Sequence, residues 1–192
     1  NIFLINPDGS NLKRLTNGSV LEENVQPVWS PDRSKIAFTS SRNGNFELFV
    51  MNPDGSNQQR ISPGDGAYSE TPSWSPDSRR IVYISSQARG DNIAMINVDG
   101  TGYTVLTEQP GDYAEPEWSP DGRTIAYVVY GATGSQIYLM DNNGKNPRML
   151  LGGGEEEFDA PAWSPDGKSL AYVAVIYGEG RTSEIYIRDI AT

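Results

Sequence analysis

The sequence has 192 residues, which is enough for one domain with a sizeable core. Lys and Arg number 15 against 25 Asp and Glu, and the resulting net charge of −10 disfavours binding to nucleic acid or to anionic lipid surfaces. The chain contains no Cys and no His, which excludes disulfides, cysteine nucleophiles, His-ligated metals and a Ser-His-Asp triad within it. No apolar run approaches the roughly 18 residues of a membrane span, so we expect no membrane insertion. The opening NIFLINPDGS lacks the layout of a signal peptide.

Residues 1–24 contain two short segments with the composition of β-strands, in NIFLIN and NLKRLT, with a Pro-Asp-Gly turn between them. The same two segments recur as the last two of four in three longer units, which we place at residues 25–70, 71–115 and 116–160. Residues 161–192 repeat only the first three segments. The sequence therefore predicts one repetitive domain over residues 1–192, made of half a unit, three full units and a partial unit.

The first segment of each unit ends in a tryptophan, and the four tryptophans are spaced 45, 44 and 45 residues apart. Each is followed by Ser-Pro-Asp, and the repeated residues are Trp29, Trp74, Trp118 and Trp163, then Pro31, Pro76, Pro120 and Pro165, then Asp32, Asp77, Asp121 and Asp166. Pro presets φ and Asp bonds its own backbone, so we interpret this signature as packing and turn formation. Arg33 and Ser78 replace the glycine of the other two turns, and a left-handed conformation would cost each about 1–2 kcal/mol.

Four short strands in each repeat of about 45 residues are typical of a β-propeller blade. The second segment is apolar on both faces, as in Ile36-Ala37 and Ile125-Ala126, which suits a sheet packed between two neighbours. A sandwich of hairpins is the alternative, but it does not require the same Trp and the same turn in every repeat. We predict an all-β propeller of four-stranded blades with about four repeats in this chain and almost no helix.

The order P-x-W-S-P-D-G, then I-A-Y/F, then I/L-Y/F-x-M, then D-G and L-T, resembles the TolB-type propeller repeat, which is also called WD-like. The resemblance covers essentially all 192 residues. It implies that the chain is part of a ring of six to eight blades that binds partners through one face. It also implies a periplasmic or otherwise extracytoplasmic location.

The segments that join one unit to the next Trp strand are LEENVQ, GDGAYSETP, QPGDYAEP and GGGEEEFDAP. We expect them to converge on one face around a central channel. A spacing of 45 residues places four side chains in equivalent positions, with three carboxylates nearby: Glu23, Tyr68, Tyr113 and Phe158, with Glu70, Glu115 and Asp159. Aromatic and acidic side chains at a channel mouth suit a basic peptide, a basic protein surface or a cation. The alternative is that the acids solubilise the loops and the aromatics fill gaps between blades.

Sequence motifs for catalysis are missing. There is no phosphate-binding loop and no G-x-S-x-G nucleophile elbow. The Asn/Asp/Gly loops lack the alternating ligands of an EF-hand, so we interpret them as turns and expect no metal and no cofactor. We therefore expect no enzymatic activity from this chain.

Three functional hypotheses remain. The favoured one is a non-catalytic scaffold that binds a protein or peptide of basic character. The alternative is the substrate-gating propeller of a prolyl-oligopeptidase-like peptidase whose catalytic domain lies outside this chain. A third is a structural array without a ligand.

The strand count at the two ends bears on assembly. The third-segment strands Ile2–Asn6 and Glu184–Asp189 occupy the same slot four repeats apart, so a closed ring of four blades would leave one of them surplus. We therefore predict an open arc that is either cut from a larger propeller or completed by a second copy of the chain to about eight blades. Its unpaired blade edges favour self-association.

Overall fold

The computed structural model describes residues 1–154, 156–177 and 181–190, and these residues form seventeen β-strands and no helix. No membrane-crossing helix occurs in these three ranges. The strands form five antiparallel sheets in chain order, as predicted. The half blade contains β1 (Phe3–Leu4) and β2 (Lys13–Arg14).

Three complete blades follow, and each has its strands in sequence order. Blade I contains β3 (Asn24–Trp29), β4 (Ile36–Ser40), β5 (Glu47–Met51) and β6 (Gln59–Arg60). Blade II contains β7 (Tyr68–Trp74), β8 (Arg80–Gln87), β9 (Gly90–Asn97) and β10 (Thr104–Val105). Blade III contains β11 (Tyr113–Trp118), β12 (Thr124–Gly131), β13 (Gly134–Asp141) and β14 (Arg148–Leu151). Blade IV is partial, with β15 (Glu157–Trp163), β16 (Ser169–Tyr177) and β17 (Arg181–Asp189).

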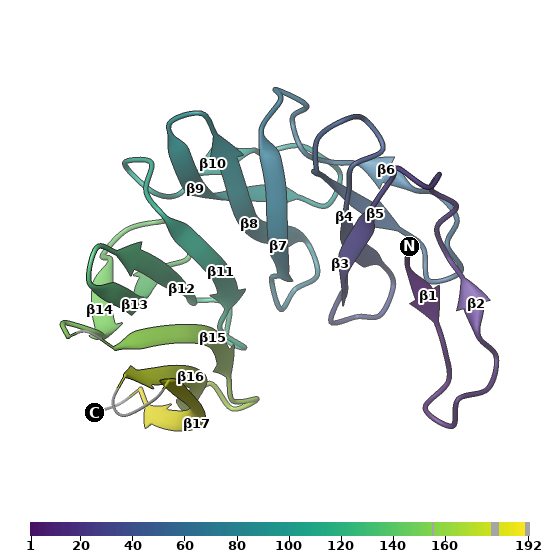
Figure 1. The fold of residues 1–192 in the computed structure, drawn as a ribbon. Helices are drawn as coiled ribbons and strands as arrows, with labels where there is room; N and C mark the ends of the chain where they lie inside the picture. Colours follow the sequence, from purple (N-terminus) through teal and green to yellow (C-terminus); the bar gives the residue numbers. More distant parts are fainter. Residues whose placement is uncertain (155, 178–180, 191–192) are drawn as a thin grey trace.

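The blades succeed one another along an arc whose two ends lie apart (Figure 1). The first strand of each blade, β3, β7, β11 or β15, lies on the inner side of the arc (Figure 1). The predicted propeller fold is therefore confirmed, with about four repeats in this chain.

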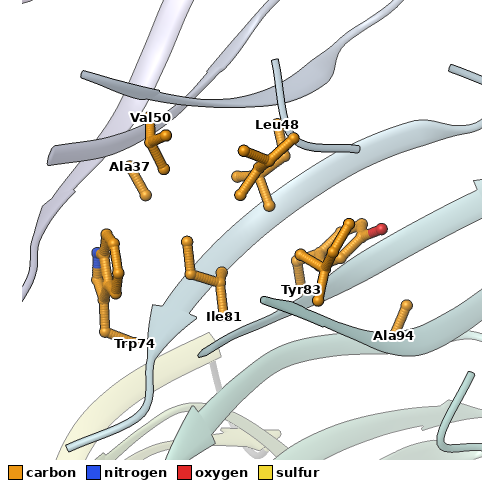
Figure 2. Close-up of a cluster of buried hydrophobic side chains, with 9 residues drawn as sticks. Ala37, Leu48, Val50, Trp74, Ile81, Tyr83 and Ala94 are labelled. Carbon is orange, nitrogen blue, oxygen red and sulfur yellow. The ribbon is translucent and has the colours of Figure 1, made fainter. Parts of the chain in front are cut away.

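The hydrophobic core lies between the blades and not within any one of them. Figure 2 shows Leu48 and Val50 of blade I facing Ile81 and Tyr83 of blade II, and all four side chains are buried. The same arrangement recurs between the half blade and blade I, between blades II and III, and between blades III and IV. Because the middle strands alternate sides, each blade contributes apolar side chains to two such layers.

Two of the repeated tryptophans bond to the preceding blade at the inner ends of these layers, whereas the indole N–H of Trp118 is buried without a partner among the described residues. Trp74 Nε1 donates to the carbonyl oxygen of Val28 at 3.1 Å, and Trp163 Nε1 donates to that of Glu117 at 3.3 Å. Trp74 and Trp118 are buried. Trp29 is 45% exposed, because the half blade that precedes it contributes no inner strand against which its ring could pack.

The Ser-Pro-Asp turns have one geometry in all four copies. The serine hydroxyl donates to the aspartate at 2.5 to 2.7 Å, for example from Ser30 to Asp32. In the first of these turns, the bond from Ser30 and the bonds from Ser34 lower the pKa of Asp32 to about 2. Arg33 and Ser78 have φ of 61° and 58°, so both positions without glycine keep the left-handed conformation and carry its cost.

The two ends of the arc expose apolar faces that are buried elsewhere. Ile185 and Ile187 on β17 are 78% and 76% exposed, whereas Leu48 and Val50, which hold the same positions in blade I, are 0% and 4% exposed. At the other end, Phe3 and Ile5 are about half exposed. The two end faces therefore correspond to the two halves of an interblade layer.

When residues 1–192 are produced alone, we expect the chain to self-associate through these end faces, because both expose apolar side chains and unpaired strand edges. Sedimentation velocity over a range of concentrations measures the mass. The variant Ile185→Lys with Ile187→Lys should sediment as a single chain. The control Val20→Lys with Leu21→Lys alters two exposed loop residues and should leave association unchanged. A single-chain mass for the unmodified protein at all concentrations would contradict this expectation.

Candidate binding surface on the inner strands

A hollow of about 610 Å³ runs along the inner side of the arc, and the first strands of all four blades line it. We call this surface the inner wall. Its lining residues are Gln26, Val28, Trp29, Pro31, Thr71, Pro72, Ser73, Trp74, Glu115, Pro116, Glu117, Trp118, Ala160, Pro161 and Ala162. Glu115 and Glu117 are its charged members, and no Lys or Arg is among them.

Each inner strand carries a β-bulge at the residue before its proline. The register with the second strand shifts at this point in all four blades. The bulged residues have φ between 48° and 52° without being glycine, and they are Gln26, Thr71, Glu115 and Ala160. A non-glycine residue in this region is strained, and such strain persists only where the surrounding structure holds it. The bulge turns these four side chains toward the inner wall.

Two of the bulged side chains bond to the next blade. Gln26 Oε1 accepts a hydrogen bond from the backbone N–H of Thr71 at 3.0 Å, and Glu115 Oε2 accepts one from that of Ala160 at 2.7 Å. Thr71 is too short for the same contact, and its hydroxyl has no partner among the described residues. The side chain at the bulge therefore joins blades I to II and III to IV, but not II to III.

Carboxylates gather where blades III and IV meet. Asp159 accepts a hydrogen bond from the hydroxyl of Tyr130 at 2.9 Å and lies close enough to Glu115 to raise the pKa of that residue. Burial is the main cause of the raised pKa of Glu115, and the bond from Ala160 opposes it. Burial also raises the pKa of Glu117 to about 7, with a smaller contribution from Glu115. This end of the inner wall is acidic, and Glu117 is partly protonated near neutral pH.

The structure distributes the predicted site residues over different environments. It brings Glu115 and Asp159 together. Glu23 is exposed in the segment just before β3, and Glu70 is exposed on β7.

The spacing of 45 residues predicted one repeat position for Glu23 and the three aromatic residues, and the strand registers show that this was wrong. Tyr113 and Phe158 correspond to each other, but Asn24 and Ser69 hold their position in blades I and II, and Glu23 and Tyr68 lie one residue earlier. Tyr68 is 46% exposed, Tyr113 is half-buried and Phe158 is 7% exposed. Phe158 packs against Tyr172 with ring centroids 5.8 Å apart, and Tyr113 packs against Tyr127 at 6.0 Å. Two of these rings thus fill space within a blade or between blades.

Sequence reasoning missed Gln26, Glu117 and Tyr130. The available signal for Gln26 was its place before a proline that recurs in every inner strand. Glu117 had no repeat signal, because Val28, Ser73 and Ala162 hold the same position in the other blades. Within the three described ranges, no three His, Cys, Asp or Glu side chains are grouped so that they could hold a metal ion.

The circular succession of four-stranded antiparallel sheets, packed face to face with their first strands innermost, defines a β-propeller domain. The chain belongs to the TolB beta-propeller domain family, whose model matches residues 1–150. A comparison with curated proteins found no match.

Solved structures share this fold at low sequence identity. TolB from Acinetobacter baumannii matches with a TM-score of 0.81 and 23% identity, over 99% of this chain and 46% of that one. Oligogalacturonate lyase from Vibrio parahaemolyticus matches at 0.76 and 20%, over 98% and 56%. A prolyl endopeptidase matches at 0.70 and 18%, over 98% and 31%. The chain therefore spans about half, or less, of the length of these proteins.

The difference in burial predicts unequal effects on stability at two of the aromatic residues that the sequence analysis singled out. Phe158→Ala should lower the free energy of unfolding by about 3–5 kcal/mol, because a buried ring is removed from the core between blades III and IV. Tyr68→Ala should change it by less than about 0.5 kcal/mol. Urea denaturation followed by tryptophan fluorescence measures both. Equal losses at the two positions would contradict the burial difference.

The raised pKa of Glu117 predicts that the free energy of unfolding decreases as the pH rises. Because the folded pKa of about 7 lies above the unfolded value of 4.5, the folded state favours the protonated form, and stability falls as pH rises from 4.5 through 7. Glu115 adds to the same slope. Glu117→Gln should therefore raise stability by about 2–3 kcal/mol at pH 8 and much less at pH 4. Thermal melts at both pH values test this, with the exposed Glu70→Gln as control. An equal gain at both pH values would refute the titration of Glu117 as the cause.

Proposed function

We propose that this chain is part of a non-catalytic propeller scaffold that binds a basic protein or peptide at the inner wall. The observation that carries the proposal is the cluster of Glu115, Glu117 and Asp159 beside a hollow whose lining includes no Lys or Arg. Carboxylates held in partial burial repel one another, and a cationic side chain would relieve both the repulsion and the desolvation. The tryptophans and prolines beside them supply flat apolar surface for the rest of a peptide.

The family resemblance supports the same proposal. A TolB-type propeller is a scaffold without a catalytic centre of its own, and we propose the same for this chain together with a periplasmic or otherwise extracytoplasmic location. The similarity to TolB from A. baumannii supports this location through the fold.

A second candidate is the gating propeller of a prolyl-oligopeptidase-like enzyme, which the similarity to a prolyl endopeptidase propeller favours. In that case a hydrolase domain would be encoded beside these residues, and the inner wall would admit peptides to it. The residues encoded on either side of this segment distinguish the two candidates.

The test is a peptide-binding measurement. A fluorescent peptide of alternating Arg and Gly, about eight residues long, should bind at low salt and weaken as salt rises, and one of alternating Glu and Gly should not bind. The variant with Glu115→Gln, Glu117→Gln and Asp159→Asn should bind about tenfold or more weakly. Fluorescence anisotropy measures both, and circular dichroism verifies the fold.

A matched control separates a local site from net charge. The control variant neutralises three carboxylates outside the inner strands, with the substitutions Asp8→Asn, Asp141→Asn and Glu184→Gln. This control should bind the basic peptide within about twofold of the unmodified chain. Equal losses in the two triple variants would mean that only net charge attracts the peptide, and the proposal would be wrong.

A further inference from the structure

A second cavity, of about 640 Å³, lies between blades II and III and away from the inner wall. One side is the end of blade II's outer strand and the loop after it, from Leu106 to Gln109. The other side is the face of blade III, with the turn that contains Gly144 and Lys145. This volume is in the range of sites that take small organic molecules.

The walls are aromatic and aliphatic. Tyr113, Tyr127 and Tyr138 form a continuous cluster, with ring centroids 6.0 Å apart for the first pair and 5.7 Å for the second. Val129 and Met140 complete the face of blade III. Methionine sulfur and tyrosine rings both pack well against an added aromatic ring.

Tyr127 supplies an unused polar group in this apolar setting. Its side chain is 4% exposed and lines the cavity, yet no hydrogen bond joins its hydroxyl to another described residue. Tyr138 also lines the cavity without such a bond, whereas Tyr113 donates to the carbonyl oxygen of Gln109 at 3.2 Å. Burial raises the pKa of Tyr127 to about 12, so its hydroxyl keeps its proton and is available as a donor. An unpaired donor in a mostly apolar wall favours a ligand that brings an acceptor.

The equivalent interface between blades I and II has no such opening at the corresponding residue. Tyr83 holds there the position that Tyr127 holds in blade III, and its hydroxyl is fully enclosed without a partner. Ala94 stands where blade III has Tyr138. The accessible hydroxyl between blades II and III is therefore not shared by the interface between blades I and II.

We propose that the cavity between blades II and III binds a planar aromatic group that carries a hydrogen-bond acceptor. The ring packs among Tyr113, Tyr127 and Met140, and the acceptor accepts a hydrogen bond from the Tyr127 hydroxyl. Glu108 and Lys145 are exposed beside the opening and contact whatever is attached to the ring. This site is independent of the acidic inner wall, and either could exist without the other.

The test uses the full chain with ¹³C-labelled methionine methyl groups. Benzamide stands for a free small molecule, and the capped tripeptide Gly-Phe-Gly for an aromatic residue of a peptide. Either probe should shift the methyl signal of Met140 by its ring current, while Met51, which is buried between the half blade and blade I, stays in place. Acetyl-alanine amide, which has the acceptor but no aromatic ring, should shift neither signal.

Two variants locate the contact. Tyr127→Phe should lower the affinity for the probe that binds by about fivefold or more, because it removes the hydrogen-bond donor and keeps the ring. The matched control Tyr83→Phe makes the same change at the sealed interface and should leave the affinity unchanged. Val129→Trp, which fills the cavity, should abolish the shift of Met140.

The probe that binds identifies the source of the aromatic group. Absence of a Met140 shift with both probes would overturn the proposal. The proposal would also be wrong if the Tyr127→Phe variant bound the probe with unchanged affinity. This result remains decisive even if Val129→Trp fails to fold.

Discussion

The contact between successive blades is the interaction on which the rest of this structure depends. No sheet here has a core of its own, because its middle strands place apolar side chains on both faces. Leu48 and Val50 become buried only against Ile81 and Tyr83 of the next blade, and the same contact is then repeated along the arc. Stability in such an array is a sum of contacts between neighbouring blades, so the last blade at either end has only one of the two interfaces that an inner blade has. Ile185 is exposed because no further blade of this chain covers the outer face of blade IV.

The same packing positions the inner wall without depending on what that wall carries. The apolar layers and the tryptophan bonds set the spacing between inner strands, and the bulge before each proline presents one side chain per blade. Gln26, Thr71, Glu115 and Ala160 occupy this position in turn, with little else in common. A repeat of this kind keeps its frame constant while single positions acquire different chemistry, so that fold similarity alone does not specify function.

The fold was largely predictable because its signals are local and repeated. Each Ser-Pro-Asp turn is encoded in consecutive residues, and the spacing of the tryptophans already places one blade beside the next. The same spacing located Glu115 and Asp159 on neighbouring blades, which the structure brings together. The bulges were not predictable, because a residue before proline is normally extended and the left-handed conformation is imposed by tertiary contacts.

One residue of the repeat was misaligned by the sequence. Trp74 and Trp118 are 44 residues apart and not 45, so a constant spacing aligned Tyr68 with Phe158, whereas the strand registers align the buried Ser69 with it. Because side chains alternate along a strand, this shift of one residue explains why Phe158 is buried against Tyr172 while Tyr68 is half exposed. The raised pKa of Glu117 could not be predicted for a different reason, since it comes from desolvation by neighbours and not from a motif.

The acidic end of the inner wall departs from the consistency that characterises the rest of the chain. Turn chemistry, strand pattern and core packing all favour one fold, whereas Glu115 and Glu117 lose hydration there, with Asp159 as a like-charged neighbour of Glu115 and Glu115 as one of Glu117. Glu115 bonds to the next blade, but folding gives no reason for a carboxylate at Glu117, because Ser73 and Ala162 show that uncharged residues fit the same position. Local conflicts of this kind are expected where a protein meets a ligand. Under the function that we propose, the cluster is one half of an ionic contact whose other half a basic partner supplies, and binding of that partner relieves the repulsion and the desolvation of the carboxylates.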